Sequence, residues 1–283
     1  MKTRKADFAG SWYPATASAC KKEIQKFLEQ KMPLPSLGRN PVGGIVPHAG
    51  WFFSGSIACN VIHALVGGPP PEIIVILGMH LHPGSPCYIM KEGAWETPFG
   101  DLLIDETLAG QLTEKFSFII ETPDSYNPDN TIELQLPFIK YFFKDSKIIP
   151  LGVPPNKKSL EIGAFIAKSA NRLGVRLKVI GSTDLTHYGS NYGFTPKGTG
   201  QNALEWVRNE NDRSAIDAML NMEPEKILQE ALTNQNACCA GAVATAIAAG
   251  KHLGAKNAQI IAYSTSYDKV PGDSFVGYVG ILF

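Results

Sequence analysis

The chain has 283 residues, 44% of them hydrophobic and 18% charged, which is typical of a globular protein with a sizeable core rather than a disordered or fibrous one. Its 26 basic and 26 acidic side chains cancel, so no net charge would attract nucleic acid or an anionic membrane surface. The expected partner is therefore a small molecule or another protein.

The sequence gives no sign of export or membrane insertion. Lys2, Arg4 and Lys5 lie near the start, but polar and aromatic residues follow them instead of the apolar segment of a signal peptide. No run approaches the roughly 20 apolar residues that span a bilayer. The five cysteines are odd in number and scattered, which favours free thiols over a disulfide framework. We therefore expect a cytoplasmic protein whose thiols are available as ligands.

Helical and β-rich patterns alternate along the chain. In order, the patterns predict a helix at 18–29, a strand at 43–46, a helix at 55–66, a strand at 72–77, a helix at 133–143, a strand at 147–151, a helix at 159–173 and a strand at 176–180. Residues 201–230 read as two helices broken at Glu223-Pro224, residues 237–250 as an apolar core helix, and residues 259–283 as a closing pair of strands. The segments 32–41 and 121–130 are predicted loops.

This alternation predicts βαβ units, and hence an α/β fold with helices on both faces of a mostly parallel sheet. No internal repeat, low-complexity tract or charged linker divides the sequence. We therefore expect one layered α/β/α domain over residues 1–283.

Three predicted strands are each followed closely by histidine. The strands at 43–46, 72–77 and 176–180 lead to His48, to His80 and His82, and to His187. Ligands bind an open parallel sheet at the carboxyl ends of its strands, so these imidazoles are expected to meet in one cleft. His63 and His252 lie within helical patterns and are assigned to surface or packing roles.

Two histidines with one thiolate or carboxylate form the usual donor set of a catalytic transition metal. From the residues alone, the third donor is Cys239, Asp184 or Glu133. Cys239 precedes a helix of small residues, and a helix N-terminus lowers the pKa of a thiol. The adjacent Cys238 reads as a buried packing residue.

Asp184 and His187 are close enough to share the site as an acid–base pair. A hydrolase triad of Ser182, Asp184 and His187 is disfavoured because the chain has no Gly-x-Ser-x-Gly elbow. Aromatic residues near the expected cleft, Trp51, Phe52 and Tyr188, are either walls of a binding groove or core residues.

Several short motifs follow one another along nearly the whole chain. They are Ala9-Gly-Ser-Trp-Tyr-Pro14, Pro47-His-Ala-Gly50 with Ser54-Gly55, Leu77-Gly78 followed by His80, Glu96-Thr-Pro-Phe-Gly100, Ile132-Glu-Leu-Gln-Leu-Pro-Phe138, Ser182-Thr-Asp-Leu-Thr-His-Tyr-Gly189, the segment around Cys239, and residues 263–280. Together they make the chain resemble the Memo family, whose prokaryotic members are called AmmeMemoRadiSam system protein B.

The resemblance implies a fold like that of class III extradiol dioxygenases and a bound iron or copper ion, with zinc as an alternative. It implies the ligands His48, His80 and Cys239, and it places Asp184 and His187 in the same pocket. It also implies cooperation with an Ammecr-type protein and a radical-SAM enzyme.

The chain departs from the family pattern at two places in the site. Asn130-Thr131 stands where a His–Ser pair is usual, which removes one imidazole near the metal. The turn at Gly78-Met79-His80 is one residue shorter than usual, so His82 rivals His80 as the ligand. In addition, a cysteine stands where extradiol dioxygenases have a carboxylate, so dioxygenase activity does not follow from the shared fold.

Three functions are compatible with these residues. The first is a metal-dependent redox or dioxygenase-like enzyme acting on a small oxygen-rich substrate. The second is a non-catalytic protein that docks a peptide or a protein partner in the same cleft. The third is a metallohydrolase that uses a metal-activated water.

Overall fold

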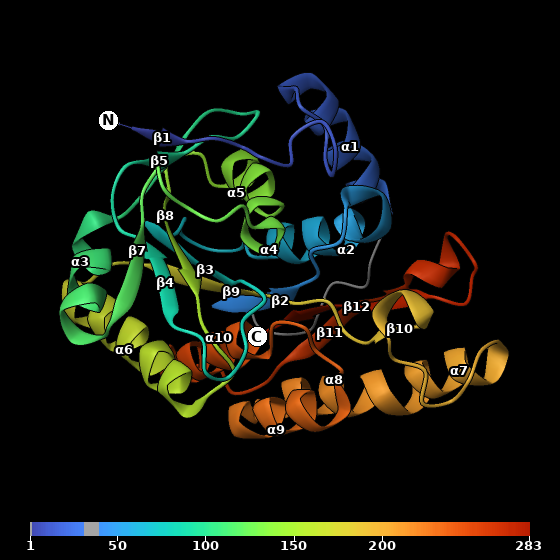
Figure 1. The fold of residues 1–283 in the computed structure, drawn as a ribbon. Helices are drawn as coiled ribbons and strands as arrows, with labels where there is room; N and C mark the ends of the chain where they lie inside the picture. The colour runs from blue at the N-terminus through green and yellow to red at the C-terminus, as the bar shows by residue number, and fades with distance from the viewer. Residues whose placement is uncertain (1, 31–39) are drawn as a thin grey trace.

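The computed structural model describes residues 2–30 and 40–283, and its main feature is a large sheet covered by helices on both faces (Figure 1). Across the sheet the strands are β10 (His187–Tyr188), β12 (Phe275–Leu282), β2 (Gly43–Val46), β9 (Leu177–Ser182), β3 (Ile73–Gly78), β8 (Lys147–Gly152), β4 (Cys87–Met90) and β7 (Phe118–Glu121), with β11 (Gln259–Thr265) paired to β12. The predicted α/β class is confirmed.

The parallel part of the sheet is its centre, where β2, β9, β3 and β8 pair in parallel. Every residue of β2, β3 and β9 is buried, which explains why these strands read as continuous apolar runs rather than alternating ones. The sheet becomes antiparallel on both sides, at β12 with β2 and at β4 with β8. A smaller sheet joins β1 (Thr3–Arg4), β5 (Ala94–Trp95) and β6 (Leu102–Leu103).

Two groups of helices form the outer layers (Figure 1). One group is α1 (Ala17–Glu29), α2 (Trp51–Ala64), α4 (Asn130–Glu133) and α5 (Leu136–Phe142), and the other is α3 (Glu106–Lys115), α6 (Lys157–Leu173), α9 (Pro224–Asn234) and α10 (Ala240–His252). Beside the second group lie α7 (Gln201–Trp206) and α8 (Asp212–Leu220), joined by a π-helical turn. None of the described helices is both long enough and apolar enough to cross a lipid bilayer.

Helix α10 packs closely on the sheet and on α6 because its side chains are small. A Cβ added to Gly163 of α6 would lie 2.5 Å from the carbonyl oxygen of Thr245, and one added to Gly181 of β9 would lie 2.9 Å from Cβ of Ala246. These contacts fix the position of α10, whose first turn follows the cysteine pair.

The predicted elements agree with the structure except in detail. The predicted helix at 133–143 is two short helices, α4 and α5, and the break at Glu223-Pro224 is the start of α9, with proline in its first turn. Most of the predicted loop at 32–41 lies outside the described residues. Trp51 and Tyr188 are core residues, whereas Phe52 is 63% exposed.

Candidate metal centre

Four side chains from three distant segments meet at the carboxyl ends of β2 and β3. His48 follows β2, His80 follows β3, and Cys238 and Cys239 precede α10. The ligand atoms of these four residues lie within 4.8 Å of one another. The structure thus brings together the three residues expected as ligands and adds Cys238.

His48 is held on three sides. Its backbone N–H donates to Oδ1 of Asp184 at 2.8 Å, and its ring Nδ1 lies 3.0 Å from Oγ of Ser182. The other ring nitrogen, Nε2, lies 3.3 Å from Sγ of Cys238. Burial alone would lower the pKa of His48, but Asp184 and Cys238 outweigh it and raise the pKa to about 9. Ser182 therefore pairs with His48 and not with His187, which excludes the triad of Ser182, Asp184 and His187.

His80 is exposed, and its ring centre lies 5.0 Å from that of His48. The residue before it, Met79, has a φ of 70°, which is uncommon for a residue with a side chain. The backbone N–H of Met79 donates to Oγ1 of Thr131 at 2.7 Å, and Thr131 donates in turn to Asp129. This left-handed residue turns the shortened loop so that His80, rather than His82, joins the cluster.

The Asn130-Thr131 pair therefore has a role of its own. The amide of Asn130 donates to the carbonyl oxygen of His48 at 3.1 Å, while Thr131 holds Met79. The start of α4 thus connects the loops that carry the two histidines.

The two cysteines differ in their surroundings. Cys238 is half-buried, and its sulfur accepts from the backbone N–H of Asp184 at 3.3 Å and lies 3.8 Å from Sγ of Cys239. Burial would raise the pKa of Cys238, but the thiol of Cys239 and the ring of His48 outweigh it and hold that pKa well below its ordinary value. Burial and the neighbouring sulfur raise the pKa of Cys239.

Two expectations about the cysteines were wrong. Cys238 is not merely a packing residue, because its sulfur contacts His48. The lowered pKa belongs to Cys238 and not to Cys239, although Cys239 stands at the start of α10, because one thiolate makes ionisation of the adjacent thiol unfavourable.

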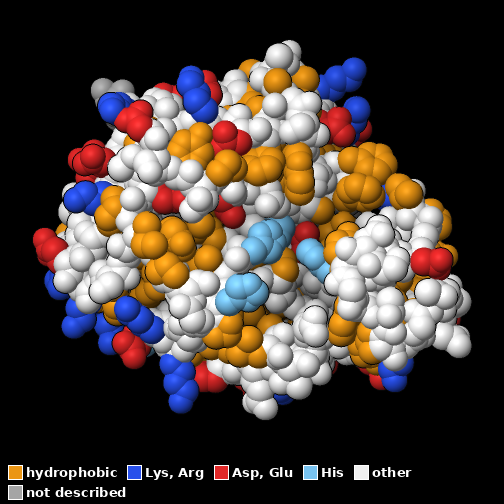
Figure 2. Space-filling model, in the orientation of Figure 1, with side chains coloured by type: hydrophobic (Ala, Val, Ile, Leu, Met, Phe, Trp, Pro, Cys, Tyr) orange, Lys and Arg blue, Asp and Glu red, His pale blue; other side chains and the backbone are white. Residues whose placement is uncertain are grey.

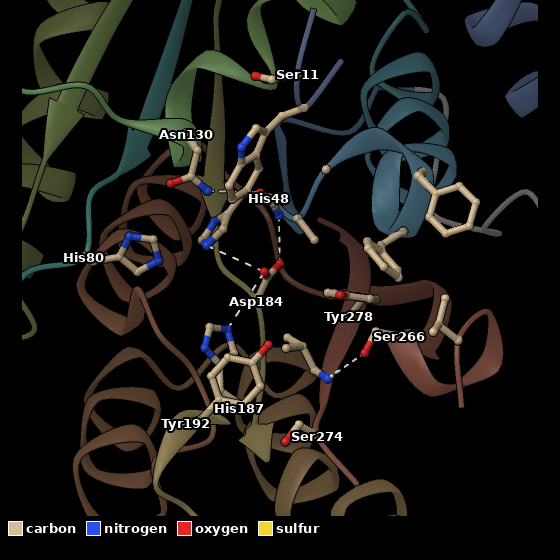
Figure 3. Close-up of a pocket in the computed structure, with 17 residues that line it drawn as sticks. Ser11, His48, His80, Asn130, Asp184, His187, Tyr192, Ser266, Ser274 and Tyr278 are labelled. Carbon is tan, nitrogen blue, oxygen red and sulfur yellow. Dashed lines mark hydrogen bonds and ion pairs between the residues drawn. The ribbon is translucent and has the colours of Figure 1, made fainter. Parts of the chain in front are cut away.

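Asp184 lies between His48 and His187 (Figure 3). Its Oδ2 is 3.9 Å from Nε2 of His48 and 4.0 Å from Nε2 of His187. Burial raises the pKa of Asp184, and His48 partly offsets this effect. Nε2 of His187 is buried and has no hydrogen-bond partner among the described residues. Burial would lower the pKa of His187, but Cys238 and Asp184 outweigh it and raise that pKa.

Glu133, one of the candidates for the third metal ligand, forms hydrogen bonds outside the cluster. Its carboxylate accepts from the backbone N–H groups of Asp7 and Phe8 and from the hydroxyl of Tyr13. These bonds attach the N-terminal segment to α4, so Glu133 has a structural role and does not join the cluster. His63 and His252 are exposed within α2 and α10.

The cluster opens into a cavity of about 610 Å³, which we call the histidine cavity. It is lined by Ser11, Trp12, His48, Ala49, Gly50, Phe52, Phe53, His80, Asn130, Asp184, His187, Tyr192, Ser266, Val270, Ser274, Val276 and Tyr278. Figure 2 shows histidine side chains gathered in a hollow at the middle of this face, with hydrophobic side chains around it. Trp12 stands in the motif at 9–14, whereas the sequence did not single out Phe53, in the first turn of α2, or Tyr192, in a short 3-10 turn after β10.

Residues 4–282 match the family model described as Memo-like protein. A MEMO1 family protein of Pyrobaculum aerophilum is 32% identical over 100% of this chain and 99% of its own length, and one of Pyrococcus furiosus is 35% identical over 99% and 98%.

Among solved structures, an uncharacterized protein of Escherichia coli K12 superposes with a TM-score of 0.54 at 12% identity, over 85% of this chain and 98% of that one. That likeness concerns the fold alone. The match to the family model and the identity to relatives of the same length extend over nearly every element described above, and on that basis the chain belongs to the Memo family.

Proposed function

We propose that this protein is a metal-dependent redox enzyme of the dioxygenase-like kind, acting on a small oxygen-rich substrate. The observation that carries the proposal is the cluster of His48, His80, Cys238 and Cys239 beside a cavity. Two imidazoles and a thiolate suit iron, copper or zinc, and of these iron or copper would supply redox chemistry.

The surroundings of His48 fit a metal ligand. Imidazoles that bind metals usually have their second ring nitrogen in a hydrogen bond, and Nδ1 of His48 has Ser182. His48, His80 and the thiolate of Cys238 would hold the ion, with Cys239 either as a further ligand or as a hydrogen-bond donor to Cys238.

The cavity supplies groups that suit an oxygen-rich substrate. Hydroxyls of Ser11, Ser274 and Tyr278 line it. His187 presents a ring nitrogen without a partner, and the carboxylate of Asp184 lies 4.0 Å from it. In its neutral form His187 can take a proton from a substrate hydroxyl, and the nearby carboxylate, which helps to raise the pKa of His187, stabilises the charge that results.

Metal content tests the proposal. Protein purified without oxygen should hold near-stoichiometric iron or copper, and His48→Ala and Cys238→Ser should both lose it. Cys239→Ser should keep the metal if Cys239 only donates a hydrogen bond to Cys238, and should bind it more weakly if Cys239 is a further ligand. His252→Ala, which changes an exposed histidine of α10, is the matched control. A wild-type protein that stays empty after anaerobic loading with iron, copper and zinc would refute the proposal.

A second function is favoured by the rim of the cavity. The side chains of Trp12 and Phe52 are 41% and 63% exposed, and exposed aromatic residues around a cavity are typical of a surface that binds a peptide or protein. On this alternative the protein binds a partner without turnover. Oxygen consumption by the metal-loaded protein, screened against small oxygen-rich compounds, separates the two functions.

A further inference from the structure

A second cavity reaches the cluster from a different side. It has a volume of about 460 Å³ and lies between the loops after β3 and β8, the end of α9 and the segment of His187 and Tyr192. We call it the cysteine cavity because Cys238 lines it, whereas His48, His80 and Asp184 line the histidine cavity.

The two cavities share a wall. His187 and Tyr192 are the described residues that line both, and their rings lie 5.0 Å apart. A molecule in the histidine cavity would thus meet the imidazoles and Asp184, while a molecule in the cysteine cavity would meet the sulfur of Cys238. Since that sulfur is 3.3 Å from Nε2 of His48, both routes end at the same cluster.

The walls of the cysteine cavity differ chemically from those of the histidine cavity. Among the residues that the structure describes, no Asp, Glu, Lys or Arg lines it, and most of its wall is aliphatic, aromatic or proline, such as Leu185, Phe194 and Leu232. Its polar groups are the rings of His82 and His187, the amide of Gln235, the phenol of Tyr192 and the thiol of Cys238. Asp184 lines only the histidine cavity, so the described walls of the cysteine cavity offer no carboxylate, ammonium or guanidinium group to an ionic molecule and suit a small uncharged one.

We propose that the cysteine cavity is a separate access route for a small uncharged co-substrate of the dioxygen class, leaving the histidine cavity to the oxygen-rich substrate. The inference rests on the proposed redox function, but the route itself is a property of the protein without metal. Two routes would allow the small molecule to reach the cluster while the substrate fills the histidine cavity.

Two matched substitutions test which cavity leads to Cys238. Leu232 lines the cysteine cavity and Val270 lines the histidine cavity, and both are aliphatic residues that are 53% exposed. Leu232→Trp and Val270→Trp therefore place the same large side chain at comparable exposure, with little expected effect on folding. Thermal unfolding of each variant checks that expectation.

The first measurement uses metal-free, reduced protein and the uncharged reagent iodoacetamide, with the labelled cysteine identified by mass spectrometry. Thiol reactions depend on access, so Leu232→Trp should slow the labelling of Cys238 by roughly fivefold or more, while Val270→Trp should leave it unchanged. Equal rates in all three proteins, or slowing by Val270→Trp alone, would overturn the route.

The second measurement uses iron(II)-loaded protein and nitric oxide, an uncharged diatomic probe whose binding to iron is followed by absorbance. Leu232→Trp should slow the association of nitric oxide with unchanged iron content, again without an effect of Val270→Trp. If the protein takes up neither iron nor copper, the proposed redox function fails while the labelling result still decides the route. If iron binds but Leu232→Trp leaves the association rate unchanged, the dioxygen-class assignment fails.

Discussion

The backbone N–H of Met79 donates to Oγ1 of Thr131 at 2.7 Å, and this bond holds Met79 in the left-handed conformation that precedes His80. The surrounding glycines make room for the turn. A Cβ at Gly78 would lie 2.2 Å from Oγ1 of Thr131, and one at Gly152 would lie 2.1 Å from the sulfur of Met79. The position of His80 thus depends on residues more than 50 positions away in sequence.

Thr131→Val should lower both stability and metal affinity. It removes the hydroxyl and leaves the buried N–H of Met79 without its partner, at a cost of about 1–3 kcal/mol in the free energy of unfolding. The affinity for metal should fall because His80 loses its fixed position. Denaturant unfolding and competitive metal titration measure the two effects. Thr131→Ser keeps the hydroxyl and should retain most of the affinity, and a Thr131→Val protein that binds metal as the wild type does would contradict this account.

Ser182→Ala should weaken metal binding with less effect on folding. The change removes the partner of Nδ1 of His48 and so frees the ring to rotate, and losses of this kind cost about 10–100-fold in metal affinity. Ser169→Ala, which deletes a buried hydroxyl in α6, is the control and should leave the affinity unchanged. Equal affinities in both variants would show that Ser182 does not orient the ring.

Asp212 should give the protein a pH-dependent stability. Its buried carboxylate accepts from Thr186 and from the hydroxyl of Tyr263, and burial raises its pKa to about 6. Because the folded state holds this proton more tightly than the unfolded chain, the contribution is complete below the unfolded pKa of 3.8 and is lost as the pH rises to about 6.

The loss is on the order of 3 kcal/mol over that interval. Denaturant unfolding of the metal-free protein between pH 4 and 7 measures it, with Asp212→Asn as the comparison. The stability difference between wild type and Asp212→Asn should change with pH in this window, and a constant difference would mean that Asp212 titrates as an exposed carboxyl does.

Arg4 and Glu121 should show strong coupling in a double-mutant cycle. The guanidinium of Arg4 is buried between the rings of Trp95 and Tyr126, at 3.6 and 4.0 Å, and its Nη1 is 2.8 Å from Oε2 of Glu121. Arg4→Met leaves a buried carboxylate without its partner, so it should cost about 3–5 kcal/mol in unfolding free energy. Adding Glu121→Gln should restore part of that loss, and additive effects of the two changes would disprove the coupling.

The sequence was sufficient to predict the class of fold and the edge of the sheet at which the histidines meet. The central strands are continuous apolar runs, which are easily recognised as buried strands. Each of three strands is followed by a histidine that the structure places at the same edge of the sheet. The residues 87–121, which contain β4, α3 and β7, were not assigned, because their strands are short and partly exposed.

Other details depended on contacts that no local pattern records. The lowered pKa of Cys238 depends on the thiol of Cys239 and on the ring of His48, and that ring reaches the sulfur only in the folded chain. Similarly, the left-handed conformation of Met79 could not be predicted, because this position is not a glycine or asparagine, the residues that usually adopt it. The metal itself and the Ammecr-type and radical-SAM partners stay predictions.

The close packing of α10 makes the cysteines of the four-residue cluster less free to move than His80. Residues 240–250 of this helix are buried, and the cysteine pair immediately precedes them. The sulfurs therefore cannot shift without disturbing the core. His80, by contrast, is an exposed side chain on a loop. We therefore expect the loop that carries His80 to move when the cluster opens to exchange an ion. The rate of ion release should then depend on the stiffness of that loop rather than on the stability of the whole protein.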